Sequence, residues 1–269
     1  MTSDVGSAAR LGDRFGVRPG WQVARLVETR PESVSARTLV LAVPRWPGHL
    51  AGQHVDLRLT AADGYTAERS YSLAGPPEAV DDDGVPTARI ELAVQRVPGG
   101  EVSTYLADDF APGQLIEVRG PIGGWFVWSP GDDGGAPVLL AAGGSGIVPL
   151  MAMVRQRRRA GDRTPFRLVY SVRRPEDRLY VSELTRPPAA DGGVESTVLY
   201  TRSAPLDARR EPGRLTASDL AAWGWPAALE PRCFVCGPTG FVEAATRLLL
   251  GLGHDPARIR TERFGPSAD

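Results

Sequence analysis

The stretch Leu139–Leu150, LLAAGGSGIVPL, decides how the second half of the chain folds. It starts with an apolar run typical of a buried strand, passes through Gly143, Gly144 and Gly146, and predicts a helix from near Val148–Pro149. Proline fits the first turn of a helix, where its missing N–H costs no hydrogen bond. Glycines let a ligand approach the backbone, and a helix start offers unpaired N–H groups. The stretch therefore predicts a diphosphate site, with a tight structural turn as the alternative.

Strand and helix patterns alternate from this point to the end of the chain. Strands are predicted at 138–142, 166–172, 196–202, 233–237 and 257–264, and helices at 148–161, 180–186, 216–224 and 239–253. This alternation predicts a doubly wound parallel sheet with helices on both faces. Ligands of such a sheet bind beyond the carboxyl ends of its strands.

The first half of the chain has a different pattern. Between positions 21 and 128, short alternating segments are separated by Pro, Gly and Asp clusters, and one helix is predicted at 102–109. Closely spaced strands of this kind favour an antiparallel barrel or sandwich. The stretch SPGDDGGAP at 129–137 reads as a linker. We therefore expect a flexible tail at 1–18 and two domains at 19–129 and 130–269.

Composition excludes several classes of function. The 31 basic and 32 acidic residues give a net charge of -1, so nothing global favours nucleic acid or an acidic membrane as a partner. No apolar run approaches the ~18 residues that span a bilayer. The first 20 residues also lack the apolar core of a signal peptide. A cytoplasmic protein is expected.

The two cysteines, Cys233 and Cys236, exclude a disulfide framework and an iron–sulfur cluster of the ordinary kind, which needs about four cysteine ligands. His49, His54 and His254 are too scattered to complete a zinc site with them. No metal site is predicted.

Three other stretches carry chemistry. ERSYSLAG at 68–75 places a cation, an aromatic ring and two serines in a predicted strand, and VPGGEVSTYL at 97–106 places two glycines before a helix start. In CGPTGF at 236–241, the cysteine ends a predicted strand. Two of them have a plainer interpretation as well: Ser103 can be only a helix-capping hydroxyl, and Cys236 only a small packed core residue.

Together these segments resemble the ferredoxin–NADP reductase superfamily. The motifs that carry the resemblance occur in the family's order: RSYS (69–72), GGEVSTYL (99–106), GPIGGWF (120–126), AGGSGIVPLMAM (142–153), YSVRRPEDRLY (170–180), CGPTGF (236–241) and ERFG (262–265). The chain looks like a stand-alone reductase module of bacterial oxygenase systems without an iron–sulfur domain. The resemblance implies a six-stranded antiparallel FAD-binding barrel followed by an NAD(P)-binding domain.

The resemblance also implies a set of flavin contacts. Arg69 would pair with the diphosphate, Tyr71 would lie against the isoalloxazine, and Ser72 would lie near its reactive edge. A guanidinium suits a phosphate, and an aromatic face suits a flat ring. The full implied set is Arg69, Ser70, Tyr71, Ser72, Val94, Gln95, Arg96, Gly99, Gly100, Val102 and Ser103. FMN in place of FAD stays open.

The implied nucleotide site lies at the strand ends of the second domain. It comprises Gly143, Gly144, Ser145, Gly146, Ser171, Arg173, Arg174, Thr201, Arg202, Cys236, Gly237 and Pro238. Arginines stand where an NAD site would carry an acidic residue, which favours NADPH over NADH. The alternative is that Arg173 and Arg174 are solvated turn residues paired with Glu176 and Asp177. The catalytic residues implied are Tyr71, Ser72, Cys236, Glu262 and Phe264, although five residues follow Phe264.

The activity implied is hydride transfer from NADPH to FAD and release of single electrons to a ferredoxin-like carrier or an oxygenase. Two alternatives remain: a diaphorase or flavin reductase that uses a small acceptor, and a nucleotide-binding regulatory subunit. The run VRQRRRAGDR contains Arg155, Arg157, Arg158 and Arg159. We interpret it either as a solvated helix end or as a docking patch for an acidic ferredoxin.

Overall fold

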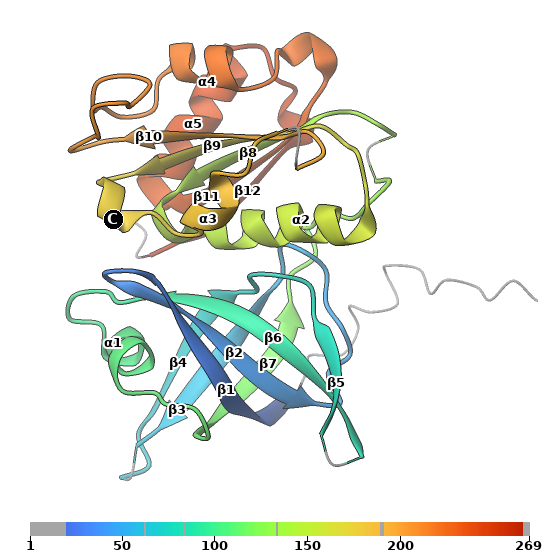
Figure 1. Ribbon diagram of the computed structural model, residues 1–269, viewed down its shortest axis with the longest axis vertical. Coiled ribbons are helices and arrows are strands. Elements are labelled where there is room, and N and C mark those ends of the chain that lie inside the picture. The colour runs from blue at the N-terminus through green and yellow to red at the C-terminus, as the bar shows by residue number, and fades with distance from the viewer. Residues whose placement is uncertain (1–19, 62, 83, 133, 189–190, 266–269) are drawn as a thin grey trace, which may run out of the picture.

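The computed structural model describes residues 20–61, 63–82, 84–132, 134–188 and 191–265. An antiparallel sheet formed by the first half of the chain lies beneath a parallel sheet with helices on both faces (Figure 1). The predicted fold class is thereby confirmed. The tail predicted at 1–18 lies outside the described residues.

The first sheet has seven strands, one more than predicted. They are β1 (Trp21–Ser33), β2 (Ala36–Pro44), β3 (His54–Thr60), β4 (Thr66–Ser72), β5 (Glu78–Asp82), β6 (Val85–Gln95) and β7 (Leu115–Ile122), in the order β4-β3-β7-β1-β2-β6-β5. The additional strand is β5, which folds back on the start of β6 as a hairpin. Helix α1 (Glu101–Asp108) begins and ends one residue before the predicted helix.

The far end of β4 approaches β6, which gives the sheet its barrel shape. Leu73 pairs with Leu92 in an isolated bridge, and the Ala74 N–H donates to the Glu91 carbonyl at 2.8 Å. Inward-facing residues of the strands, with Val102, Leu106 and Phe110 at and after α1, form one apolar core. Burial of this apolar surface is what stabilises the barrel. Helix α1 contacts both β4 and β6.

The second sheet is parallel and five-stranded. Its strands are β8 (Val138–Gly143), β9 (Phe166–Val172), β10 (Val194–Tyr200), β11 (Arg232–Pro238) and β12 (Ile259–Phe264), in the order β10-β9-β8-β11-β12. Its helices are α2 (Ile147–Ala160), α3 (Val181–Leu184), α4 (Ala217–Trp223) and α5 (Thr239–Gly251). The chain runs from β8 outward in one direction and then crosses to β11. The strand order therefore reverses between β8 and β11, where this type of sheet binds ligands.

Apolar packing continues from one sheet to the other. Phe126 and Trp128 follow the last barrel strand, and their rings lie 5.4 Å and 5.0 Å, centroid to centroid, from Phe234 and Phe166 of the parallel sheet. Both belong to one core cluster that includes residues of both domains. The two domains are therefore joined by a shared core and not only by a linker.

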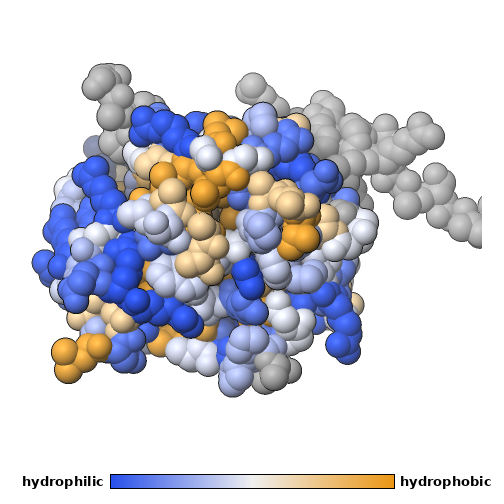
Figure 2. All heavy atoms as spheres, turned by 90° about the horizontal axis from the view of Figure 1, so that it is seen from above, coloured by the Kyte–Doolittle hydropathy of each residue, from blue (hydrophilic) through white to orange (hydrophobic). Residues whose placement is uncertain are grey.

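The face of the second domain that points away from the barrel is mixed in character. Figure 2 shows a group of apolar side chains bordered by hydrophilic ones. Leu206, Leu229 and Leu250 are among the exposed large apolar residues of this domain. None of the helices in the described residues is long and apolar enough to cross a membrane.

Candidate functional site

Strand β4, at the edge of the barrel, presents Arg69 and Tyr71 on one face. Arg69 is exposed, and its Nη1 donates to the Glu68 backbone oxygen at 2.7 Å. Tyr71 packs against the barrel core, and burial raises the pKa of its hydroxyl to about 12, against a smaller opposing effect of the Arg69 charge. Among the described residues no carboxylate pairs with Arg69. The guanidinium is therefore available to an anion, beside an uncharged aromatic ring.

Ser70 faces the other way, as the alternation of a strand requires. Its hydroxyl donates to Asp56 Oδ1 at 2.6 Å, and Arg119 donates to the other oxygen of the same carboxylate. The Ser70 side chain therefore belongs to the polar outer wall of the barrel, and its role as a cofactor ligand stays a prediction. Ser72 lies half-buried at the end of β4, opposite His54.

The turn before α1 is shaped by two glycines. Gly99 has φ +74°, in the left-handed region that favours glycine, and a Cβ on Gly100 would lie 2.6 Å from Ser103 Oγ. Ser103 is only 9% exposed, and its hydroxyl accepts from the Val97 N–H at 3.1 Å and donates to the Gly100 carbonyl. The Ser103 hydroxyl thus bonds to its own turn, as the helix-capping interpretation expects, and its role as a donor to the cofactor stays a prediction. The donors that α1 offers are the backbone N–H groups of its first turn.

The segment between β6 and this turn holds the other predicted flavin contacts. Val94 is fully buried in the barrel core, so only its backbone can face a ligand. Gln95 Nε2 donates to Ser35 Oγ at 3.3 Å, and exposed Arg96 pairs with Asp108 at 3.4 Å. Both polar side chains thus have partners within the protein, and their contact with a cofactor stays a prediction.

In the turn between β8 and α2, the three glycines differ in how closely other atoms surround them. A Cβ on Gly143 would lie 2.6 Å from the Phe241 ring, and one on Gly146 would lie 2.2 Å from the Cys236 carbonyl oxygen. Both glycines are thus needed for packing. Gly144 differs, because its φ is +55° and nothing lies within 4 Å of an added Cβ. Open space for a diphosphate is therefore found at Gly144, next to half-buried Ser145.

Cys236 and Glu262 are paired residues of neighbouring strands at this edge. Cys236 is 0% exposed, and burial together with the Glu262 charge raises the pKa of its thiol well above the ordinary value. Burial raises the pKa of the partly exposed Glu262 to about 7. The thiol is therefore a neutral, enclosed group, in agreement with the plainer interpretation, whereas Glu262 can hold or release a proton near neutral pH. Two positions further along the same two strands, exposed Phe264 pairs with Pro238.

Arg173 and Arg202 lie at the carboxyl ends of β9 and β10 and are joined through their backbones. The backbone N–H groups of Thr201 and Arg202 donate to the carbonyls of Val172 and Arg173, at 2.8 Å and 3.0 Å. Arg173 and Arg202 are exposed, and in the part of the chain that the structure describes neither forms an ion pair. Arg174, in contrast, pairs with Glu176 at 3.8 Å. The solvated-turn interpretation thus describes Arg174 but not Arg173.

Both interpretations of the arginine run are wrong for three of its four members. Arg157 is 1% exposed, and its guanidinium donates to the carbonyls of Thr164, Asp191 and Gly192. Arg155 and Arg158 pair with carboxylates inside the molecule. The end of α2 packs against other elements, so these cations are neither a solvated helix end nor a docking patch. Only Arg159 is exposed, with Nη1 on the Pro77 carbonyl.

Sequence reasoning missed one hollow of the barrel. A pocket of about 580 Å³ lies between the β3–β4 hairpin and α1. Its lining includes Leu59, Tyr65, Ala67, Val102, Tyr105 and Leu115. No motif marks it, because its walls come from five separate elements.

Comparison with known proteins agrees with this geometry. Residues 23–127 match the model of an oxidoreductase FAD-binding domain, and residues 140–247 match that of an oxidoreductase NAD-binding domain. Over 250 residues, the chain is 33% identical to ferredoxin–NADP reductase B of Sorangium cellulosum, covering 90% of this chain and 96% of that protein.

Two further relatives extend the comparison. The chain is 33% identical over 219 residues to a glycine betaine monooxygenase reductase subunit of Pseudomonas aeruginosa, covering 80% of this chain and 56% of that subunit. It therefore spans little more than half the length of that relative. A crystal structure of a cytochrome P450 reductase of Amycolatopsis superimposes with a TM-score of 0.76 at 26% identity, covering 93% of this chain and 72% of the other.

Proposed function

Because this chain belongs to the ferredoxin–NADP reductase superfamily, we propose that it transfers hydride from NADPH to bound FAD and passes electrons singly to an external protein acceptor. The observation that carries the proposal is that the molecule offers two positions suited to an anion, one in each domain. One comprises exposed Arg69 on β4 and the first turn of α1, two elements that contact each other, and the other is the open turn at Gly144 at the switch point of the parallel sheet.

The residues of the barrel fit a flavin. Arg69 would bind the diphosphate, since a guanidinium donates two parallel hydrogen bonds to such a group. Tyr71 would orient the isoalloxazine by packing against it, because its ring is held by the barrel core and its hydroxyl stays neutral. Bound FAD would supply the redox chemistry itself. The protein binds and orients the reactants and excludes water between them.

Glu262 has the property expected of a group that moves a proton. Its carboxyl is partly enclosed and its pKa of about 7 lets it exchange a proton at neutral pH. Cys236 would act differently, because its neutral and enclosed thiol supports the strand end on which Gly146 packs. Ser72 and Phe264 would border the flavin from the two domains.

Arg173 and Arg202 support NADPH rather than NADH as the donor. Their exposed guanidinium groups, free of ion pairs among the described residues, suit a 2′-phosphate. The double substitution Arg173→Ala and Arg202→Ala is expected to weaken NADPH binding at least about tenfold while leaving NADH binding within about twofold. Arg174→Ala, at a residue already paired with Glu176, is the matched control.

The acceptor we propose is a ferredoxin or an oxygenase component. The reductase subunit of a monooxygenase among the relatives supports this class of partner. The test is anaerobic stopped-flow mixing of the purified holoprotein with NADPH or NADH, followed by cytochrome c reduction with and without added ferredoxin. Flavin that stays oxidised with both nucleotides contradicts the proposal, and cytochrome reduction that needs no ferredoxin favours a small-molecule acceptor instead.

A further inference from the structure

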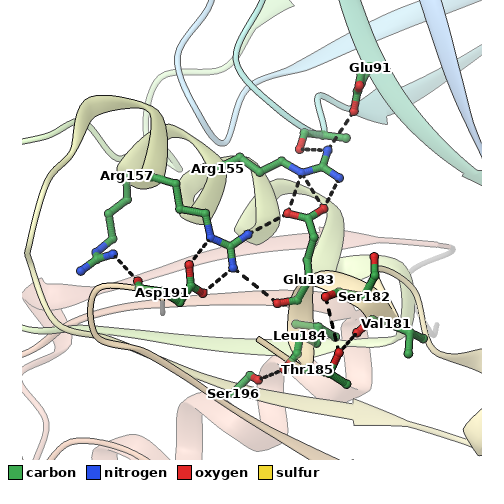
Figure 3. Close-up of polar contacts among 12 residues, drawn as sticks. Glu91, Arg155, Arg157, Val181, Ser182, Glu183, Leu184, Thr185, Asp191 and Ser196 are labelled. Atoms are coloured by element: carbon green, nitrogen blue, oxygen red, sulfur yellow. Dashed lines mark hydrogen bonds and ion pairs between the residues drawn. The ribbon is translucent and has the colours of Figure 1, made fainter. Parts of the chain in front are cut away.

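Arg155, in the middle of α2, bonds to both domains at once (Figure 3). Its Nη1 donates to Glu91 Oε2 at 2.9 Å and to the Ala74 carbonyl at 3.0 Å, and both acceptors belong to the barrel. Its Nε and Nη2 donate to the carboxylate of Glu183 in α3, which belongs to the parallel-sheet domain. One guanidinium therefore joins the two domains through fixed, directional hydrogen bonds.

The acceptors of Arg155 lie next to the proposed flavin contacts. Ala74 is two residues beyond Ser72, and Glu91 lies on β6 three residues before Val94. On the other side, α2 starts directly after the Gly144 turn. The side chain thus connects the barrel strands that would hold the flavin with the helix whose start would face the nucleotide diphosphate.

Arg155 is itself held in place from several sides. Glu183 also accepts from Arg158 Nη1 at 2.7 Å, and Arg158 pairs with Asp191 in turn. The Arg155 guanidinium lies 4.8 Å from the centroid of the Tyr180 ring. Such a network restricts the guanidinium to one orientation, since its planar fork satisfies three acceptors in different directions.

We propose that Arg155 is a positioning residue that sets the distance and tilt between nicotinamide and flavin, an inference that rests on the proposed function. Arg155 acts through Ala74, Glu91 and the start of α2, not by touching either reactant. Hydride transfer needs reacting atoms about 3–3.5 Å apart, and a displacement of about 1 Å can cost about a hundredfold in rate. A contact that helps to fix the orientation of the two domains therefore affects the rate of hydride transfer.

The test uses anaerobic single-turnover reduction of the holoprotein by NADPH with two variants, Arg155→Ala and Glu91→Ala. In both we expect the limiting rate of flavin reduction to fall at least about tenfold while the Kd for NADPH changes less than about threefold and flavin content stays full. The long-wavelength charge-transfer absorbance of stacked nicotinamide and flavin should weaken in parallel. Glu91→Ala removes the same contact from the barrel side by truncating a part-buried surface residue. It therefore tests the proposal even if Arg155→Ala does not fold.

Two further variants separate geometry from charge. Arg155→Lys keeps the charge, but its compact ammonium lacks the planar fork that spans the acceptors of both domains, so it should remain nearly as slow as Arg155→Ala. Arg30→Ala removes the other cation on the Glu91 carboxylate, a contact made within the barrel, and should react at the wild-type rate. Wild-type rates in both Arg155→Ala and Glu91→Ala, or an equal loss in Arg30→Ala, would overturn the proposal.

Hydrogen exchange in the nucleotide-free holoprotein separates this inference from the proposed function. Arg155→Ala should speed exchange at residues 72–77 and at 180–184 relative to the wild type, and Arg30→Ala should leave residues 180–184 unchanged. If neither nucleotide reduces the wild-type flavin, the proposed function is wrong. Unchanged exchange in Arg155→Ala would overturn the link between the domains whether or not the flavin is reduced.

Discussion

At the scale of single residues, Arg69 gives the most direct test of the flavin site. Its guanidinium bonds only to a backbone oxygen within the described residues, so its removal should change the free energy of unfolding of the apoprotein by less than about 0.5 kcal/mol. Hydrogen bonds to charged groups contribute about 1.5–3 kcal/mol. Arg69→Ala should therefore weaken FAD binding about 10- to 100-fold, as measured by flavin titration of the apoprotein.

The control for Arg69 is Arg89→Ala, which removes another exposed arginine from a barrel strand. It should bind FAD as the wild type does. Equal FAD affinity in the two variants would contradict the diphosphate role.

Glu262 makes stability depend on pH in a direction that can be worked out. Burial raises the pKa of its carboxyl from 4.5 to about 7 on folding, so between these values the folded protein binds more protons than the unfolded one. Its contribution to the free energy of unfolding therefore falls as pH rises from about 4.5 to 7 and is constant outside that window. Glu262→Gln should remove this decline. Urea unfolding of both proteins at pH 5, 6, 7 and 8 measures the difference, and parallel pH profiles would refute the assignment.

At the scale of elements, the turn between β8 and α2 contains one glycine with open space around it and two glycines packed against their neighbours. Gly144→Ala places a side chain at φ +55° in open space and should cost about 1–2 kcal/mol of stability. Gly146→Ala drives a Cβ to 2.2 Å from the Cys236 carbonyl oxygen, so it must push α2 away from β11. Its cost should reach or exceed about 3 kcal/mol, the upper end for overpacked sites. Denaturant unfolding ranks the two, and an equal or reversed ranking contradicts this division of roles.

The elements themselves follow well from local pattern. The predicted strand at 166–172 has the bounds of β9, and the helix predicted at 239–253 begins where α5 begins. Short-range periodicity and glycine punctuation are enough for such elements, because they reflect local burial and backbone freedom. The strand β5 was missed because five residues with an acidic end carry too little periodicity.

Side-chain partners were predicted less well, for a different reason. A serine in a binding motif can bond to a ligand or to its own fold, and Ser70 and Ser103 both bond to the fold. The arginines of α2 carry the pattern of a solvated helix end, but Arg155 reaches Glu91, which is 64 positions away. Contacts at such separations depend on the tertiary fold, so no local pattern reports them.

At the scale of the whole molecule, the two domains share a core as well as an ion-pair network. Trp128 contacts both domains: its backbone N–H donates to the Ala51 carbonyl of the barrel at 3.1 Å, and its ring packs edge-on against Phe166 at the start of β9. Domains with small polar interfaces move independently by default. An apolar cluster that extends through both domains opposes such motion, which suits a reaction that needs two cofactors in register.

We therefore expect the apoprotein to unfold in one cooperative transition, with calorimetric and van't Hoff enthalpies equal. Trp128 is 1% exposed, so Trp128→Ala leaves a cavity that should cost about 3–5 kcal/mol of stability. It should also raise the ratio of the calorimetric to the van't Hoff enthalpy above one. The matched control is Trp125→Ala, because Trp125 is 63% exposed and the Arg260 guanidinium lies 5.2 Å from the centroid of its ring. Loss of that contact should cost about 1 kcal/mol or less and leave the transition cooperative. A Trp128→Ala protein that loses no more stability than Trp125→Ala would show that the domains are held by other contacts, with the Arg155 network foremost among them.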